Sequence, residues 1–194
     1  MELIRIKETE YLSGIKWSAP IPYKNVSKKF TQLANESDEA KFGIICRFKD
    51  NAVIGLINES RKPKQKSASV YLANANGVEY ANLLQEGTEK SLAWICVQKV
   101  YGGKYWIGNA LNGLPFADDV IIDNSNSKEI EDVIANLLTT LKVQSLDEKI
   151  INIFVEDEDL NYTLTKVANA HKDVNIFSKD FNDLVGEVKY QASF

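Results

Sequence analysis

The chain has 194 residues, of which 44% are hydrophobic, 26% charged and 10% aromatic. This is ordinary globular composition, and it excludes a disordered, collagen-like or linker-like chain. The net charge of −4 provides no general attraction to nucleic acid or to anionic membranes, so we expect no nucleic-acid partner. The first 90 residues carry a net charge of +3 and the remainder a net charge of −7. This asymmetry favours two subdomains, residues 1–90 and 91–194.

Cysteine usage and the absence of targeting signals indicate the compartment. Cys46 and Cys96 lie inside apolar runs without paired spacing, so we expect two reduced thiols in the core rather than a disulfide scaffold or a metal site. The N-terminus lacks the basic start and apolar stretch of a signal peptide. No run approaches the roughly 18–20 apolar residues that a membrane helix needs. We therefore expect a soluble, cytoplasmic chain.

The first half of the sequence has weak periodicity. Apolar alternation predicts strands over residues 3–6, 44–48 and 52–57, with Asp50-Asn51 as a hairpin turn. Helices are predicted over residues 27–35 and 78–85, the second opening after Gly77. Residues 69–72 have the pattern of a further strand.

The second half opens with a stronger signal. Residues 92–100 are apolar on both alternating faces, which is typical of a central strand covered on two sides. Gly102-Gly103 suits a two-residue hairpin turn into a second strand, residues 104–111. Asn112-Gly113 is another turn signal, and a third strand follows at residues 120–122.

Helices and strands then alternate to the end of the sequence. An apolar stripe at helical spacing predicts a helix capped by Asn126 or Ser127, with Ile130, Val133, Ile134, Leu137, Leu138 and Leu141 on one face. Residues 150–155 have the pattern of a buried parallel strand. A helix at residues 160–168, a strand at 174–177 and a helical turn at 180–185 complete the chain.

The second half therefore has the order β-β-β-α-β-α-β-α. Three antiparallel strands followed by crossovers through helices form the layout of the ribonuclease-H-like fold, which is also the half-unit of actin-like proteins. We expect a mixed α/β sheet, with the first half as a reduced copy of the same unit.

The residues that ribonuclease-H-like or actin-like enzymes need are missing. Two-metal nuclease chemistry requires a carboxylate on the first strand, and residues 92–100 contain no Asp or Glu. Actin-like ATPases place an acidic residue beside the glycines of the hairpin that follows, whereas KVYGGKYW (99–106) has only the glycines. Gln98 also stands where a P-loop would need its first glycine. We expect no catalytic residue, although an atypical phosphate loop on Gly102 and Gly103 remains an alternative.

Three charged features each have a structural explanation, and two of them also have a functional alternative. His171 is expected to pack near a helix C-terminus. The acidic run at residues 156–159 is expected to be solvated at a helix N-terminus, with a divalent-cation site as the alternative. The basic residues around Pro63 are either a solvated loop or a contact for an acidic partner or lipid headgroups. These partner-binding candidates are Arg61, Lys62, Lys64 and Lys66.

Three stretches resemble PilO-type accessory proteins of type IVb pili. YLSGIKW (11–17) is similar to the early G-x-x-W stretch of that family, and FGIICRFKDNAVIGL (42–56) resembles its hairpin. Residues 91–123 resemble its core of spaced Trp, Gly and Asp, which an amphipathic helix follows. The similarity covers most of residues 1–160 and rests on no catalytic signature. Later residues match only by element order.

The resemblance implies a degenerate actin-like cytoplasmic domain, similar to bundle-forming-pilus inner-membrane components and to the type II secretion L protein. It implies a non-enzymatic scaffold without cofactor or metal. Such a scaffold holds the hexameric assembly ATPase at the bacterial inner membrane and couples it to the polytopic platform protein. The family's membrane helix is absent, so we expect it beyond residue 194 in a full-length protein. A nucleotide-binding protein and a free-standing cytosolic interaction domain are the alternatives, and a homodimer is left open.

Overall fold

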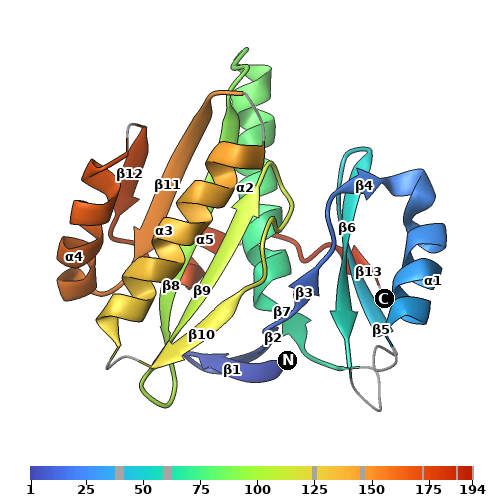
Figure 1. Ribbon diagram of the computed structural model, residues 1–194, viewed down its shortest axis with the longest axis horizontal. Coiled ribbons are helices and arrows are strands. Elements are labelled where there is room, and N and C mark those ends of the chain that lie inside the picture. Colours follow the sequence, from blue (N-terminus) through green and yellow to red (C-terminus); the bar gives the residue numbers. More distant parts are fainter. Residues whose placement is uncertain are drawn as a thin grey trace.

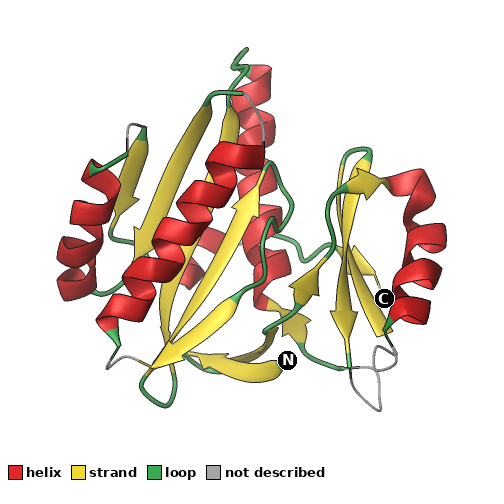
Figure 2. Cartoon of the chain, viewed as in Figure 1, coloured by secondary structure: helices red, strands yellow, loops and turns green. Residues whose placement is uncertain are grey.

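The computed structural model describes residues 1–37, 42–58, 63–123, 126–144, 147–171, 173–186 and 188–193. Its elements form two lobes that stand side by side (Figure 1). The large lobe has a five-stranded sheet with helices on both faces, and the small lobe has a second sheet with one helix against it (Figure 2). The fold is therefore the predicted mixed α/β type.

The sheet of the large lobe is built around β8 (Ser91–Val100). β9 (Lys104–Leu111) pairs with β8 antiparallel on one side, and β11 (Lys149–Val155) pairs with it parallel on the other. β10 (Val120–Asp123) and β12 (Val174–Phe177) are the outer strands, which gives the order β10-β9-β8-β11-β12. The central strand, the three-stranded antiparallel run and the buried parallel strand are confirmed.

α3 (Ser127–Gln144) and α4 (Glu158–Asn169) cover one face of this sheet, where Ile95 is buried. Asn126 caps α3, because its Oδ1 accepts a hydrogen bond from the backbone N–H of Glu129 at 3.1 Å. The predicted apolar stripe faces the sheet, and its fully buried members are Ile130, Ile134, Leu137, Leu138 and Leu141.

α2 (Ala68–Gln85) and α5 (Phe181–Val185) cover the opposite face, where Trp94 is buried. The predicted strand at residues 69–72 is wrong, because this segment is the first turn of α2. The helix begins at Ala68, ten residues before the predicted start, and Ser67 caps it, because its side chain accepts from the N–H of Val70. Its first ten residues are buried on nearly every side, so they lack the polar face that marks an amphipathic helix in sequence.

The small lobe is centred on the hairpin of β5 (Phe42–Phe48) and β6 (Asn51–Ile57). Phe48 pairs with Asn51, so the turn is Lys49–Asp50, one residue earlier than predicted. α1 (Val26–Glu36) packs on one face of this hairpin, as the pattern at residues 27–35 predicts.

Short strands complete the small lobe. β3 (Lys16–Trp17) and β4 (Ile21–Pro22) pair with β6, and the 3-10 turn η1 (Tyr23–Asn25) leads from β4 into α1. β13 (Ala192–Ser193) returns from the end of the sequence to pair with β5. Two-residue strands carry no alternation, so the sequence gives no signal for them.

A third sheet joins the lobes at the lower side of Figure 1. β1 (Glu2–Ile6), predicted at residues 3–6, pairs antiparallel with β2 (Thr9–Ser13), and β2 pairs parallel with β7 (Lys66–Ser67). One hydrophobic core contains residues from this sheet, from β5 and β6, and from β8, β9 and α5. The predicted boundary at residue 90 thus runs through a shared core.

No helix in the described part of the chain is long and apolar enough to cross a membrane.

Candidate functional site

Two of the family-like motifs meet at Asp119, in the loop between β9 and β10. Its Oδ1 accepts from the backbone N–H of Ile15 at 3.0 Å, and its Oδ2 accepts from the N–H of Gly14 at 3.1 Å. The indole Nε1–H of Trp106 donates to the same Oδ2 at 2.6 Å. The neighbouring Asp118 accepts from the N–H of Trp17 at 2.9 Å. The motif residues thus tie the segment after β2 to the central sheet.

Burial decides what Asp119 can do. The residue is 3% exposed. Desolvation raises its pKa, while the hydrogen bonds from Trp106, Ile15 and Gly14 act in the opposite direction. A buried carboxyl group that accepts hydrogen bonds from three N–H donors holds a loop in place. The spacing of Gly, Trp and Asp in the motifs therefore has a structural explanation.

The glycine hairpin is a three-residue loop, Tyr101–Gly103, because Val100 pairs directly with Lys104. Both glycines have positive φ, as a turn requires, but the predicted two-residue turn is wrong by one residue. The N–H of Tyr101 donates to the carbonyl of Arg5 at 3.0 Å, so β1 lies against the hairpin. A hollow of about 440 Å³ beside it is lined by Arg5 and Lys104 but also by Glu2 and Glu10. The loop therefore faces carboxylates as well as cations.

In the acidic run at residues 156–159, Glu156 and Asp157 accept hydrogen bonds from different donors. Glu156 Oε2 accepts from Gln98 Nε2 at 2.5 Å. Asp157 Oδ2 accepts from the Tyr105 hydroxyl at 2.8 Å, and its Oδ1 caps α4 by accepting from two backbone N–H groups. The Tyr105 hydrogen bond is the main cause that lowers the pKa of Asp157. Burial and the same hydrogen bond raise the pKa of Tyr105 to about 12. Across the ranges that the structure describes, no three His, Cys, Asp or Glu side chains are placed to hold a metal ion.

His171 and the cysteines have ordinary surroundings. His171 is half-buried just after the end of α4, and its Nδ1 lies 2.6 Å from Lys142 Nζ on α3. Cys46 and Cys96 are free and fully buried, as predicted. Burial raises the pKa of Cys46 to about 12 and that of Cys96 further still, so both stay thiols.

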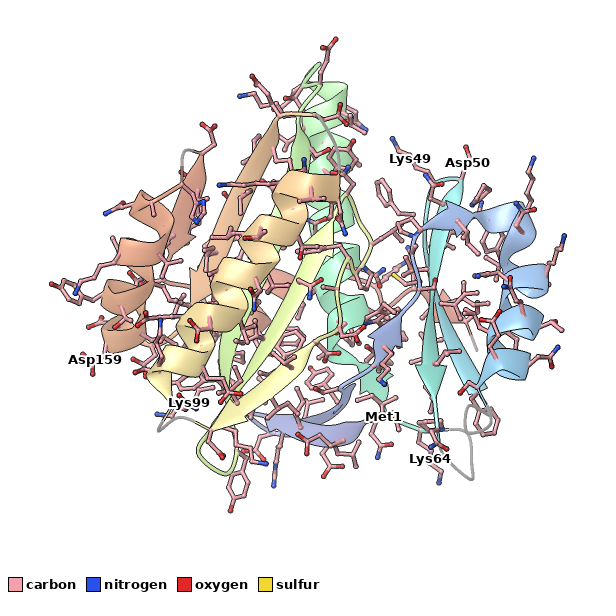
Figure 3. The ribbon with its side chains drawn as sticks, in the orientation of Figure 1. Met1, Lys49, Asp50, Lys64, Lys99 and Asp159 are labelled. Carbon is pink, nitrogen blue, oxygen red and sulfur yellow. The ribbon has the colours of Figure 1, made fainter. Side chains whose placement is uncertain are left out.

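The structure describes two of the four basic residues predicted to bind a partner. Arg61 and Lys62 lie outside the described residues. Lys64 is exposed at the lower end of the small lobe (Figure 3). Lys66 begins β7, where its Nζ lies 3.1 Å from the Tyr71 hydroxyl and 5.3 Å from the centre of the Tyr190 ring. Lys66 is therefore held against two aromatic rings, whereas Lys64 points into solvent.

A groove that the sequence did not indicate lies at the opposite end of the small lobe, beside the Lys49–Asp50 turn labelled in Figure 3. One hollow of about 620 Å³ is lined by Tyr23, Arg47, Lys49 and residues 191–193. A second of about 550 Å³ lies along α2 and shares Arg47, Phe48 and Gln191 with the first. We call these two neighbouring hollows, which share three lining residues, the Arg47 groove.

Comparisons with known proteins give a likeness of fold. No protein-family model matches this chain, and neither does any curated protein sequence. Among solved structures, the cytoplasmic domain of BfpC is similar to it, with a TM-score of 0.50 at 10% sequence identity. The superposition covers 81% of this chain and 83% of that one. At this identity the likeness shows a shared fold alone.

This likeness agrees with the resemblance that the sequence motifs indicated. It supports the expected similarity to a pilus inner-membrane component of the BfpC kind, at the level of the fold. It does not single out PilO-type proteins. Two of the three stretches that suggested the family meet at Asp119, where their residues have a structural role.

Proposed function

We propose that this chain is a non-enzymatic scaffold domain of a type IVb pilus assembly complex at the cytoplasmic face of the bacterial inner membrane. It recruits the hexameric assembly ATPase and couples it to the polytopic platform protein. The observation that carries the proposal is the fold shared with the cytoplasmic domain of BfpC over 81% of the chain.

The sheet topology supports the finer fold assignment. Three antiparallel strands, then two strands parallel to the first, in the order β10-β9-β8-β11-β12, form a ribonuclease-H-like unit in this proposal. The small lobe then takes the place of a reduced second unit, and the whole is a degenerate actin-like domain.

The surroundings of the hairpin favour a scaffold over a nucleotide-binding protein. β8 carries no Asp or Glu, and the Tyr101–Gly103 loop contains no acid that could hold Mg²⁺. The side of this loop where β1 lies presents Glu2 and Glu10 beside Arg5 and Lys104, so the hollow is not a purely cationic site for phosphate. These features support a domain that works by binding proteins.

Titration calorimetry against the N-terminal domain of a pilus assembly ATPase from the same organism tests the proposal. We expect a saturable one-to-one isotherm with the ATPase domain and no heat with Mg-ATP. Absence of heat and of co-elution with the ATPase domain contradicts ATPase recruitment. Saturable binding of Mg-ATP supports the nucleotide-binding alternative instead.

The basic loop is the proposed contact for the ATPase or the membrane. Its charges are reversed together in one variant: Arg61, Lys62, Lys64 and Lys66. A matched control reverses four exposed lysines of the large lobe: Lys128, Lys142, Lys166 and Lys179. We expect weaker association only in the loop variant, since complementary charge acts locally at about 10 Å in physiological salt. Equal affinities in the two variants would contradict this contact.

A further inference from the structure

The Arg47 groove has a cationic end at the top of the small lobe. The Arg47 guanidinium carbon lies 3.8 Å from the centre of the Tyr23 ring, and Nε donates to the carbonyl of Lys49 at 2.8 Å. These contacts fix the guanidinium, while its two terminal nitrogens have no hydrogen-bond partner within the described residues. A planar cation held in this way is suited to a carboxylate, because little side-chain entropy is lost when the carboxylate binds.

The groove has a cationic lining. Arg47, Lys49 and Lys189 line it, and none of the three forms an ion pair in the part of the chain that the structure describes. Of the lining residues described, none is Asp or Glu. The charged residues among the described lining of the groove are therefore all cations, with Asp50 in the adjacent turn, although the whole chain has a net charge of −4.

The other end of the groove is apolar. Val78 and Ala81 lie on adjacent turns of α2 and line it together with Phe48 and Val188. Val78 is 54% exposed, a large apolar side chain left in solvent. The wall opposite α2 is held by Asn74, whose Oδ1 accepts from the N–H of Gln191 at 2.8 Å. The apolar end is thus a formed surface, and exposed apolar residues beside a fixed wall are typical of a docking surface.

We infer that the Arg47 groove binds an acidic peptide segment of a partner protein. Carboxylates of the segment pair with Arg47, Lys49 and Lys189, and one of its apolar side chains packs on Val78. A nucleotide is disfavoured, because phosphate recognition uses free backbone N–H groups at a helix N-terminus or glycine loop. The groove instead follows the middle of α2, where the helix itself uses those N–H groups.

The groove gives the proposed scaffold a specific contact, so the identity of the partner as a pilus component rests on the proposed function. Lys49 of the groove and Lys64 of the basic loop lie at opposite ends of the small lobe (Figure 3). Mutations in one therefore leave the other intact, and the two contacts can be tested separately.

Fluorescence anisotropy with a defined probe tests the inference. The probe is a fluorescein-labelled peptide of Glu-Glu-Leu repeats, and its counterpart has Gln in place of Glu. We expect saturable binding of the Glu peptide and weaker binding of the Gln peptide. R47E/K49E should weaken the Glu peptide by about tenfold or more, which corresponds to about 1.4 kcal/mol. K142E/K166E changes the net charge equally on the large lobe and should alter the affinity by less than about twofold.

A third variant tests the apolar end. V78S replaces the apolar side chain with a small neutral one at an exposed position, so folding should be retained, and the Glu peptide should bind less tightly because the apolar contact is lost. Circular dichroism and the unfolding midpoint confirm that each variant is folded. If the Glu peptide fails to bind the wild type, or if both double variants weaken it equally, the inference is wrong. Binding of labelled ATP that R47E/K49E abolishes, without peptide binding, also overturns it.

The same variants separate this inference from the proposed function. If the ATPase domain binds the wild type and R47E/K49E equally while the peptide does not bind, the scaffold role stands and the groove does not. If the peptide binds in a way that depends on Arg47 and Lys49 but the ATPase domain does not bind, the groove inference stands and ATPase recruitment does not.

Discussion

Asp119 connects residues that are 105 positions apart, since its partner Gly14 lies in the segment after β2. The carboxylate collects two backbone N–H groups and the indole N–H of Trp106, all of which would otherwise be buried without acceptors. Gly14 has a φ of 67°, so the chain turns there in a conformation that other residues rarely adopt. The G-x-x-W motif is therefore the segment whose backbone N–H groups bind the buried carboxyl group of Asp119.

Removal of this carboxyl group should be costly. D119A leaves three buried donors unpaired, at about 1–3 kcal/mol each, and we expect a loss of about 3–5 kcal/mol after partial relaxation. Urea unfolding followed by tryptophan fluorescence measures the loss. D118A is the matched control, because its single hydrogen bond to Trp17 is exposed, and it should cost less than about 1 kcal/mol. Equal losses in the two variants would show that Asp119 has no special role.

At the scale of elements, α5 is joined to the β1–β2 turn by an ion pair. Lys7 Nζ lies 2.6 Å from Asp180 Oδ2, and Asp180 also caps α5 through the N–H of Asp183. Desolvation works to raise the pKa of Asp180, but the bonds from Lys7 and the Asp183 N–H outweigh it and lower the pKa. The ionised carboxylate is thus the form that the fold stabilises.

The pH dependence of stability follows from this shift. A carboxyl group with a lowered folded-state pKa stabilises the fold above its unfolded pKa of about 3.9, and this contribution is lost as the pH falls through the folded pKa. Unfolding by urea between about pH 7 and about pH 2.5 measures the effect. D180N should flatten the acid limb of the stability curve, and K7M should make it shallower, because without Lys7 the folded-state pKa of Asp180 lies closer to its unfolded value. An unchanged acid limb in D180N would contradict this assignment.

At the scale of the whole molecule, the lobes join where α2 passes Phe48 of β5. Gly77 of α2 is one point of close approach. A Cβ at this position would lie 2.9 Å from Phe48 Cδ2 and 3.1 Å from the Cα of Gly113. Phe48 belongs to the small lobe, so the absence of a side chain at residue 77 lets the two lobes pack closely here, and Gly113, in the loop after β9, holds the same position of α2 from within the large lobe.

G77A should therefore separate the two lobes slightly. Replacing Gly by Ala inside a helix normally stabilises it by about 1 kcal/mol, but overpacking against backbone costs about 1–3 kcal/mol, and we expect a net loss of stability. Urea unfolding measures the change. V78A, on the exposed face of the same helix, is the control and should be within about 0.5 kcal/mol of the wild type. A G77A variant more stable than the wild type would show that the lobes are not tightly packed there.

The strongest sequence patterns determined the large lobe. β8 is apolar on both faces, and α3 has one continuous apolar stripe with Asn126 as its cap, so each is specified by residues within a few positions of one another. The same local signals identified β11, β12 and α4. Local periodicity is sufficient where an element has one buried face, or two, over its whole length.

Tertiary structure alone decided the rest. The start of α2 is buried all round and has no polar face, the two residues of β13 are a strand only because β5 lies beside them, and Asp119 is a clamp only because Gly14 folds against it. The Arg47 groove likewise combines residues from β5, α2 and the final segment. Hydrophobic periodicity indicates which face of a helix or strand is buried. The features named above depend instead on which distant segment packs against that face. Neighbouring residues in the sequence carry no signal for such long-range contacts.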